Sequence, residues 1–306
     1  MVDKVKKVWI DGQFVDWDDA TVHILTHSLH YGLAAFEGIR AYKRADGGTY
    51  VFRLREHVDR LFDSCKMCLL KPEFTREQIT SVCADTLRVN GMPEGYLRPM
   101  VYVGEGAMGI YAPNNPVRTL VAGWKWGAYL GEEALKNGIR AKMSSFARLH
   151  VNVNLAKGKI TGQYTNSVLA KREAISAGYD EAILLDNAGH VCEASGENVF
   201  MVKKGRLYTA PLSASILGGI TRDSVLQLAR DNKIEVREEL FNRDQLWCAD
   251  EVFMCGTAAE VTPVREIDSR KIGAGEPGAV TRKIQAAFFE AVKGERTPYP
   301  DWLTYL

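Results

Sequence analysis

The apolar residues of this chain follow two different periods in alternating segments, and this alternation constrains the fold more than any other feature. At the N-terminus, residues 8–10 and 13–15 flank the dipeptide Asp11-Gly12, a two-residue turn that is typical of a β-hairpin. Residues 55–69 and 75–89 instead carry apolar side chains at the spacing of an amphipathic helix. The sequence therefore predicts a mixture of helices and strands and argues against an all-helical protein.

The rest of the chain continues the alternation in shorter elements. We expect strands at 96–103, 119–122, 138–145, 181–186, 199–202 and 207–209, and helices at 164–177, 221–232 and 280–292. Segment 124–138 is rich in glycine and aromatic residues and follows neither period, which is typical of a connection. We therefore predict a small N-terminal domain at 1–123, an interdomain loop at 124–138 and a large C-terminal domain at 139–306.

The charges of the chain are balanced. Its 306 residues include 39 Lys and Arg against 38 Asp and Glu, a formal net charge of +1. A nucleic acid or an anionic membrane requires a basic surplus, so we expect neither as a partner. The apolar runs fall far short of the roughly 20 residues of a membrane helix, and six cysteines are too few for a disulfide scaffold. We therefore expect a cytoplasmic protein that acts on small molecules.

Cys65 and Cys68 form a C-x-x-C pair that is compatible with half of a zinc site. Cys65, however, falls on the apolar stripe of the helix predicted at 55–69, where burial is the usual fate of a free cysteine. The chain has no second C-x-x-C to complete such a site. We therefore predict no metal site.

Residues 104–109 match the pattern G-x-G-x-x-G after a predicted strand. A dinucleotide site would need a helix directly after this pattern, because the helix N-terminus holds the pyrophosphate. Pro113 and Pro116 follow instead, and proline prevents such a helix. A gate or substrate loop is the better interpretation.

Two glycine-containing turns could hold a phosphate. Gly218 and Gly219 lead into the helix predicted at 221–232, with Thr221 as its expected cap. An ordinary capped turn explains this segment equally well. The segment 255–260 offers a second turn with small residues and a hydroxyl at Thr257. Since no P-loop lysine accompanies them, a phosphate bound here would serve as an anchor and would not be transferred.

Lysines 157 and 159 lie in a glycine-spaced stretch before a predicted helix, where desolvation can turn a lysine into a nucleophile for carbonyl groups. Farther along, Glu193 and Glu197 stand among small residues before an apolar strand, and a carboxylate buried there must face a positive charge. A Schiff-base lysine, a carboxylate for a pyridinium nitrogen and turns for a phosphate together match the needs of pyridoxal 5′-phosphate. Each signal alone is weak, and the combination carries the interpretation.

At these residues the sequence resembles the fold-type IV pyridoxal-phosphate enzymes, and among them the branched-chain amino-acid aminotransferases. The similarity runs from Val8 to about Gly294. Its most specific blocks are 27–32 (HSLHYG), 36–40 (FEGIR), 193–200, 217–223 and 251–263. The resemblance implies an α+β fold with a small N-terminal α/β domain and a larger C-terminal pseudo-barrel domain that binds the cofactor.

The resemblance also implies roles for individual residues. Lys159 would form the Schiff base with the cofactor and act as the catalytic base; it is chosen over Lys157 because the family's lysine lies five residues before a tyrosine, here Tyr164. Tyr164 would bind the cofactor's phenolic oxygen, and Glu193 would pair with the ring nitrogen. The remaining cofactor contacts would come from Arg60, Leu217, Gly219, Ile220, Thr221, Gly256 and Thr257.

The implied reaction moves the amino group of leucine, isoleucine or valine to 2-oxoglutarate, giving branched-chain 2-oxo acids and glutamate. Tyr96 and the Thr257-Ala258 turn would bind the α-carboxylate, and Arg98 would bind the distal carboxylate of glutamate, because one pocket must accept both side chains. The other residues implied in substrate binding are Tyr31, Phe36, Gly38, Arg40, Met108, Ile110, Trp126 and Tyr129.

In the family, Tyr31 and the loop at Met108 to Ile110 enter the neighbouring subunit's site, which implies a homodimer and leaves open a higher assembly such as a hexamer. Other activities remain open as well. D-amino-acid transaminases, (R)-amine transaminases and aminodeoxychorismate lyase share Lys159 and Glu193, and a non-catalytic metabolite binder could keep the fold. Tyr96-Leu97-Arg98, Arg40 and the 108–110 loop favour the branched-chain enzyme.

Overall fold

The computed structural model describes residues 2–44, 46–127, 129–295 and 299–306. The chain forms two compact units: the first comprises residues 1–127, 158–163 and 291–306, and the second comprises 128–157 and 164–290. Ala128, which falls in the predicted interdomain loop, lies outside the described residues. The domain boundaries at 123 and 139 stay predictions. In the structure the chain returns to the first unit at 158–163, and sequence periodicity gives no sign of such a return.

One antiparallel sheet organises the first unit. Its strand order is β17-β5-β4-β6-β7-β1-β2, and β3 pairs with one end of β6. The hairpin predicted at 8–15 is confirmed as β1 and β2, with Val8 opposite Val15. The strands are β1 (Lys7–Ile10), β2 (Gln13–Asp16), β3 (Ala34–Phe36), β4 (Ile39–Lys43), β5 (Thr49–Phe52), β6 (Gly95–Val103), β7 (Val117–Trp124) and β17 (Leu303–Tyr305).

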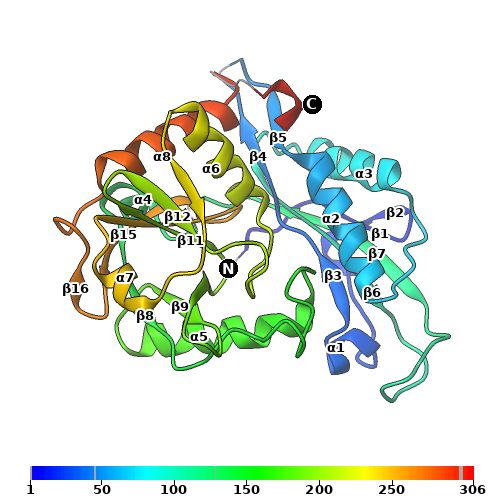
Figure 1. Cartoon of the computed structure of the whole chain (residues 1–306). Helices are drawn as coiled ribbons and strands as arrows, with labels where there is room; N and C mark the ends of the chain where they lie inside the picture. The colour runs from blue at the N-terminus through cyan, green and yellow to red at the C-terminus, as the bar shows by residue number, and fades with distance from the viewer. Residues whose placement is uncertain (1, 45, 128, 296–298) are drawn as a thin grey trace. The chain divides into compact units, whose positions relative to one another are not determined.

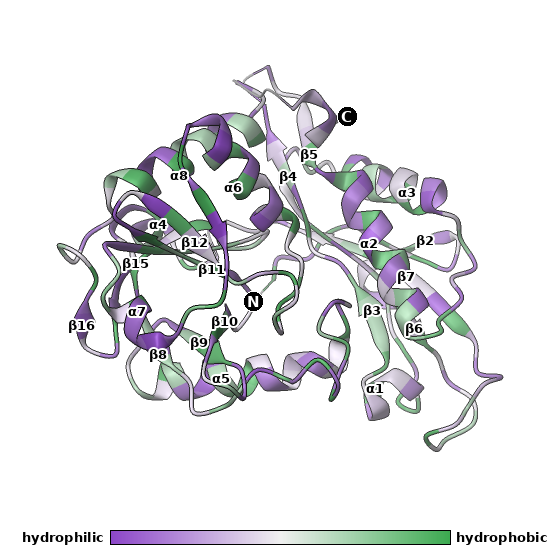
Figure 2. Ribbon diagram, in the orientation of Figure 1, coloured by the Kyte–Doolittle hydropathy of each residue, from purple (hydrophilic) through white to green (hydrophobic). Residues whose placement is uncertain are grey.

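Two helices pack together beside this sheet, α2 (Leu54–Met67) and α3 (Arg76–Val89). Both confirm predicted helices. Polar and apolar residues alternate along them (Figure 2), and Val58, Leu61 and Cys65 of α2 are buried in the core of the unit. Thr75 caps α3 by accepting a hydrogen bond from Gln78 N–H. The unit also contains α1 (His27–Tyr31) and the 3₁₀ turns Trp17–Asp19, Thr161–Gln163 and Pro300–Trp302.

The second unit is built on a nine-stranded sheet whose central strands close into a ring. The strand order is β10-β9-β8-β15-β14-β11-β12-β13, with β16 on β15, and a further pairing joins β10 to β11. That pairing places Glu193 opposite Asn198. The strands are β8 (Ile139–Met143), β9 (Glu181–Leu185), β10 (Val191–Ala194), β11 (Asn198–Lys203), β12 (Arg206–Thr209), β13 (Val236–Glu238), β14 (Glu251–Gly256), β15 (Glu260–Ile267) and β16 (Arg270–Lys271).

Five helices accompany the closed sheet. In Figure 1, α6 and α8 run along one side of it and α5 along the other. The helix α4 lies in segment 124–138, where the sequence showed no helical period, because its six residues are too few to reveal one. The helices are α4 (Glu132–Asn137), α5 (Tyr164–Ser176), α6 (Ile220–Asp231), α7 (Arg243–Trp247) and α8 (Ala279–Val292).

The α+β class predicted from the sequence is confirmed, as is the closed strand barrel in the C-terminal part of the chain. Within the described residues, none of the helices has the length and apolar character needed to cross a membrane. The segment after the G-x-G-x-x-G pattern forms no helix between Gly104 and Pro116, which confirms that it lacks the structural context of a dinucleotide site.

Candidate active site

Lys159 belongs to the first unit and is fixed there by its backbone. Its N–H donates to Ser64 Oγ at 2.9 Å, and its carbonyl accepts from Phe36 N–H at 3.0 Å. The next residue, Ile160, forms a bridge with Ala35 at the edge of β3. The Lys159 ammonium lies 5.1 Å from the centroid of the Phe36 ring. The backbone of this lysine is thus anchored to a strand and a helix, although Lys159 itself lies in a connecting segment.

Lys157 is held differently, within the second unit. Its Nζ donates to the carbonyl oxygens of Ala214 at 2.8 Å and Ile216 at 2.9 Å. Burial lowers the pKa of this lysine, and the nearby Glu193 carboxylate only partly opposes the effect. The ammonium therefore serves to hold the loop that leads to Leu217.

A buried carboxylate organises the first unit beside β3. Glu37 is fully buried and accepts from Arg60 Nε at 2.6 Å and from Arg60 Nη2 at 2.9 Å. His57 Nδ1 lies 2.7 Å from Glu37 Oε2. Burial opposes ionisation of Glu37, but the Arg60 guanidinium and the His57 ring outweigh it and hold the pKa of the carboxyl well below its usual range. The family resemblance predicts Arg60 as a ligand of a phosphate and predicts no role for Glu37 or His57.

Three predicted substrate residues of the first unit, Phe36, Tyr96 and Trp126, lie near Arg98 on β6. Its guanidinium carbon lies 4.7 Å from the Phe36 ring centroid and 5.6 Å from that of Tyr96. The Tyr96 ring in turn meets Trp126 edge to face at 4.6 Å. Arg98 Nε is buried and has no hydrogen-bond partner within the described part of the chain. A buried guanidinium nitrogen in an aromatic surrounding is suited to a carboxylate ligand.

Gly38 and Arg40 lie close to this group. A Cβ atom on Gly38 would stand 1.7 Å from the Tyr96 hydroxyl, so only glycine leaves room for that tyrosine. Arg40 Nη2 donates to the carbonyls of Trp126 at 3.4 Å and Gly127 at 3.2 Å. This arginine therefore holds the residues that directly follow β7.

The loop after β6 rests on α1 of the same unit. Gly109 N–H donates to the Tyr31 hydroxyl at 3.0 Å, and His27 Nε2 lies 2.8 Å from the Gly109 carbonyl oxygen. Beyond this attachment the loop is apolar and open: Ile110 is 91% exposed, and Met108 is also exposed. The role of Tyr31, Met108 and Ile110 in a partner's site stays a prediction.

Glu193 on β10 is the centre of the predicted cofactor residues in the second unit. It is buried, and its Oε1 lies 2.7 Å from Arg148 Nε. Its Oε2 accepts from Leu217 N–H at 2.9 Å and from Asn198 Nδ2 at 3.3 Å. The cationic Arg148 favours the ionised carboxylate. Arg148 and Asn198 had no assigned role in the sequence analysis; Asn198 lies inside a block that resembled the family, and Arg148 had no local signal.

Both glycine-containing turns lie near Glu193. One is connected to it by the pairing of neighbouring strands, and the other by the hydrogen bond from Leu217. Asn198 pairs with Cys255 on β14, and the turn at Thr257 and Ala258 follows that strand. At the other turn, Gly219 is the N-cap of α6, so the expected cap at Thr221 is wrong. The helix begins earlier because Gly219 adopts the extended cap conformation, and Ile220 and Thr221 form its first turn and are buried. A Cβ on Gly219 would lie 2.1 Å from Asn198 Oδ1.

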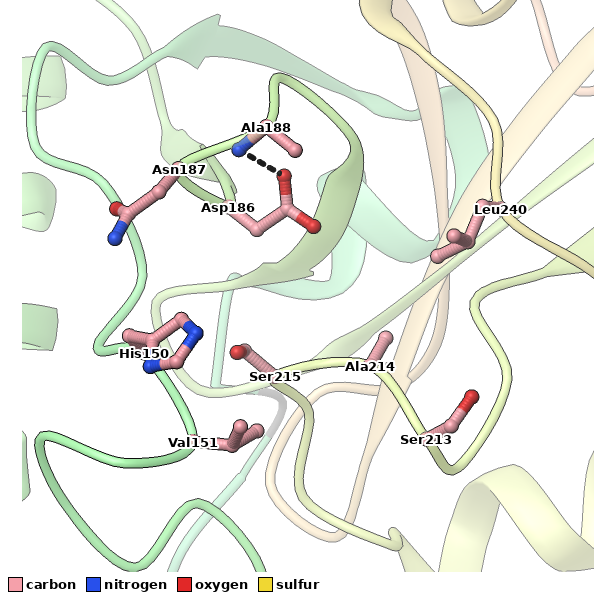
Figure 3. A pocket seen from close by; sticks show the side chains of 9 residues that line it. All are labelled: His150, Val151, Asp186, Asn187, Ala188, Ser213, Ala214, Ser215 and Leu240. Carbon is pink, nitrogen blue, oxygen red and sulfur yellow. Dashed lines mark hydrogen bonds between the residues drawn. The ribbon is translucent and has the colours of Figure 1, made fainter.

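Gly256 is the last residue of β14, and two further predicted residues lie on or next to α5. Tyr164 is the first residue of α5. Tyr129 is 39% exposed, and the Lys171 ammonium lies 5.6 Å from its ring centroid. The second unit also contains a cavity of ≈ 380 Å³, where Ala188 N–H donates to Asp186 (Figure 3). Its lining includes His150 and Ser215 but none of the predicted site residues.

Comparison with known proteins identifies the class to which this fold and these residues belong. The profile of the amino-transferase class IV family matches residues 34–267. The chain belongs to this family, and within it to the branched-chain-amino-acid aminotransferases. A branched-chain-amino-acid aminotransferase from Pseudomonas aeruginosa is 47% identical over 304 residues, covering 99% of this chain and 98% of the relative.

Solved structures show the same similarity. A branched-chain amino acid aminotransferase from the organism abbreviated T.th., with pyridoxamine 5′-phosphate, has a TM-score of 0.95 and 48% identity, covering 99% of each chain. The same enzyme complexed with N-(5′-phosphopyridoxyl)-L-glutamate has a TM-score of 0.93 and 45% identity, again covering 99% of each chain. The family resemblance on which the sequence analysis relied is thereby confirmed.

Proposed function

We propose that this protein transfers the amino group of leucine, isoleucine or valine to 2-oxoglutarate, with pyridoxal 5′-phosphate as its cofactor. The observation that carries the proposal is the near-complete match to branched-chain aminotransferases, 47% identity over 99% of the chain. The cofactor is supported by the pyridoxamine phosphate and phosphopyridoxyl-glutamate bound by similar structures.

The residues of this chain fit the cofactor. The buried Glu193 offers a carboxylate beside Arg148, and Gly219 opens α6 at a point where a side chain would collide with Asn198. A helix N-terminus donates amides to a phosphate. We assign the ring nitrogen to Glu193, the phenolic oxygen to Tyr164 and the aldehyde carbon to Lys159. The phosphate falls to Arg60, Ile220, Thr221 and Thr257, with Gly219 and Gly256 leaving room and Leu217 packing on the ring.

Two lysines compete for the covalent role, and their contacts favour Lys159. Lys157 Nζ donates to two backbone carbonyls, and it would lose these contacts if it formed a bond to a carbonyl carbon. The Lys159 ammonium lies next to the Phe36 ring, within the group that contains Arg98 and Tyr96. This position suits an amine that exchanges places with a substrate amine.

The mechanism follows from what these residues can do. The cofactor, when bound, supplies an electron-accepting ring that stabilises negative charge on the substrate α-carbon. Glu193 stays anionic beside Arg148 and Asn198, so it can hold a proton on the ring nitrogen. Lys159 would hold the aldehyde carbon of the cofactor, and its Nζ as a free amine would move a proton to and from the substrate α-carbon. The same residue would serve both halves of the transamination.

Substrate selection is assigned to the group around Arg98. Its buried Nε can donate to the distal carboxylate of glutamate, whereas the rings of Phe36, Tyr96 and Trp126 suit a branched aliphatic side chain. Tyr96 with Thr257 and Ala258 takes the α-carboxylate in this proposal. In this proposal Gly38, Arg40 and Tyr129 are also assigned to substrate binding, and Tyr31, Met108 and Ile110 are assigned to the site of a partner subunit.

Initial rates with L-leucine, D-alanine and (R)-1-phenylethylamine, each with 2-oxoglutarate, test the function. We expect L-leucine to exceed both other donors by roughly 100-fold or more in kcat/KM. The amine has no carboxylate for the site to bind, and D-alanine presents its groups in the mirror-image arrangement and lacks the branched side chain. Activity restricted to D-alanine or to the amine would replace the proposal with a transaminase of that type. No turnover of any donor by protein loaded with pyridoxal phosphate would point to a metabolite binder or a lyase.

We also propose that the protein acts in the cytoplasm as a homodimer. All six cysteines are free, which suits a reducing compartment. Ile110, Tyr111 and Leu29 of the first unit are large apolar residues that are strongly exposed, and an apolar surface of this kind is typical of a subunit interface.

A further inference from the structure

Glu37 carries a carboxylate that is completely buried in the first unit. It stands between Phe36 and Gly38, and its carboxylate receives hydrogen bonds from three neighbours: Arg60, His57 and the N–H of Gly38 at 3.2 Å. A buried carboxylate is costly unless it is paired and hydrogen-bonded. A buried charge at this position lowers the stability of the folded protein. We therefore looked for a neighbouring group that depends on it.

The contacts with Arg60 are directional. One carboxylate oxygen accepts from Nε and the other from Nη2, which is the bidentate geometry that fixes both the plane and the rotation of a guanidinium. Arg60 itself retains 14% of its side-chain exposure, whereas Glu37 has none. The pair therefore holds one edge of the guanidinium inside the unit and determines where the rest of the group points.

His57 supports the carboxylate from behind. Burial lowers the pKa of the histidine, although Glu37 opposes this effect, so the ring is neutral at neutral pH. Since an ionised carboxylate only accepts hydrogen bonds, Nδ1 must carry the proton and donate to Glu37 Oε2. His57 thus adds a directional bond without adding a second positive charge, and the Glu37–Arg60 pair stays electrically neutral as a unit.

We propose that Glu37 is a positioning residue that aims Arg60 at the phosphate of the cofactor, with His57 holding Glu37 in place. The inference rests on the proposed function, in which Arg60 binds that phosphate. Because Glu37 neutralises the charge of Arg60, the arginine contributes oriented N–H donors more than net attraction. Loss of Glu37 should therefore weaken recognition of the phosphate group specifically.

The test compares two ligands that differ only in the phosphate. Affinities of the apoprotein for pyridoxal 5′-phosphate and for pyridoxal are measured by absorbance titration, for the wild type, Glu37→Gln and Arg60→Met. We expect Glu37→Gln to lose about tenfold or more in affinity for the phosphorylated ligand and less than about twofold for pyridoxal. Arg60→Met should show the same selective loss, and His57→Asn, which keeps a donor near Nδ1, should behave like the wild type.

A matched control separates this effect from the loss of any ion pair. Asp11 accepts from Arg118 Nε at 2.6 Å in the same unit. This pair is more exposed than Glu37–Arg60, so Asp11→Asn removes an arginine–carboxylate pair away from Arg60 and should leave the ratio of the two affinities unchanged. If Glu37→Gln fails to fold, Glu37→Asp keeps the charge but reaches only one guanidinium nitrogen, and it should show the same selective loss.

The outcomes are distinguishable. Equal weakening of both ligands in the Glu37 variants, or the same change in Asp11→Asn, would mean that Glu37 has only a structural role. An unchanged ratio in the Glu37 variants with a selective loss in Arg60→Met would overturn the positioning role and leave the phosphate assignment of Arg60 intact. An unchanged ratio in Arg60→Met would overturn both.

Discussion

At the scale of single residues, the contacts of a side chain decide between candidates that the sequence cannot separate. Lys157 and Lys159 lie two positions apart in the same glycine-spaced stretch. In the structure the first donates to two carbonyl oxygens, and the second is anchored by its backbone next to an aromatic ring. Covalent use of Lys157 would break both of these hydrogen bonds and release the loop that they hold, so Lys159 is the better candidate for the nucleophile.

Substituting each lysine in turn tests this distinction. Protein reconstituted with pyridoxal phosphate should absorb at roughly 400 to 430 nm when a lysine holds the cofactor. We expect Lys159→Ala to lose this band and to retain under about 1% of the transamination rate, because it removes both the covalent link and the base. Lys157→Met should keep the band. A Lys159→Ala protein with full activity would eliminate this residue as the catalytic base.

At the scale of elements, long periodic segments were predictable and short ones were not. The helices at α2, α3, α5, α6 and α8 were all expected within a few residues of their observed ends. Nine strands were missed, namely β3, β4, β5, β10, β13, β14, β15, β16 and β17, and so were the short helices α1, α4 and α7. A strand buried on both faces has no alternation to detect, as in β3, whose three residues are all buried, and a six-residue helix offers less than two turns of periodicity.

The start of α6 shows how an element end determines a site. Gly219 caps the helix, and an added Cβ would come within 2.1 Å of Asn198 Oδ1. We expect Gly219→Ala to lower the free energy of unfolding by about 1–3 kcal/mol, since the clash forces a shift of well-packed groups. It should also weaken binding of pyridoxal phosphate about tenfold, because Asn198 contacts Glu193 and the helix start lies at the assigned phosphate site.

Gly218→Ala is the matched control for this prediction. The nearest atom to a Cβ at that position is Leu212 Cδ2 at 3.6 Å, an ordinary contact. Thermal or urea unfolding together with cofactor titration measures both quantities. Equal behaviour of the two variants would show that the Gly219 clash is relieved without cost.

At the scale of the whole molecule, the first unit leaves apolar side chains in solvent that a lone chain would not favour. Ile110 is 91% exposed in a loop that is attached to Tyr31. We expect light scattering to give at least twice the mass of one chain and Ile110→Glu to shift the protein toward monomer, because a charge in an apolar interface is desolvated without a partner. Leu69→Glu is the control, as Leu69 is 88% exposed on another part of the unit.

A monomeric wild type would refute the dimer. If Leu69→Glu disrupts the dimer and Ile110→Glu does not, the interface does not include this loop.

The sequence by itself determined the α+β class, the long helices, the family and the identity of Lys159, Glu193 and Arg60 as candidates, because periodicity and motifs are written in neighbouring residues. Only the tertiary structure decided what surrounds them. Arg148 reaches Glu193 from 45 positions away, and Glu37 reaches Arg60 across 23. Such pairings form because a buried charge is stable only beside a partner. The partner can come from any distance along the sequence, so no local pattern predicts it.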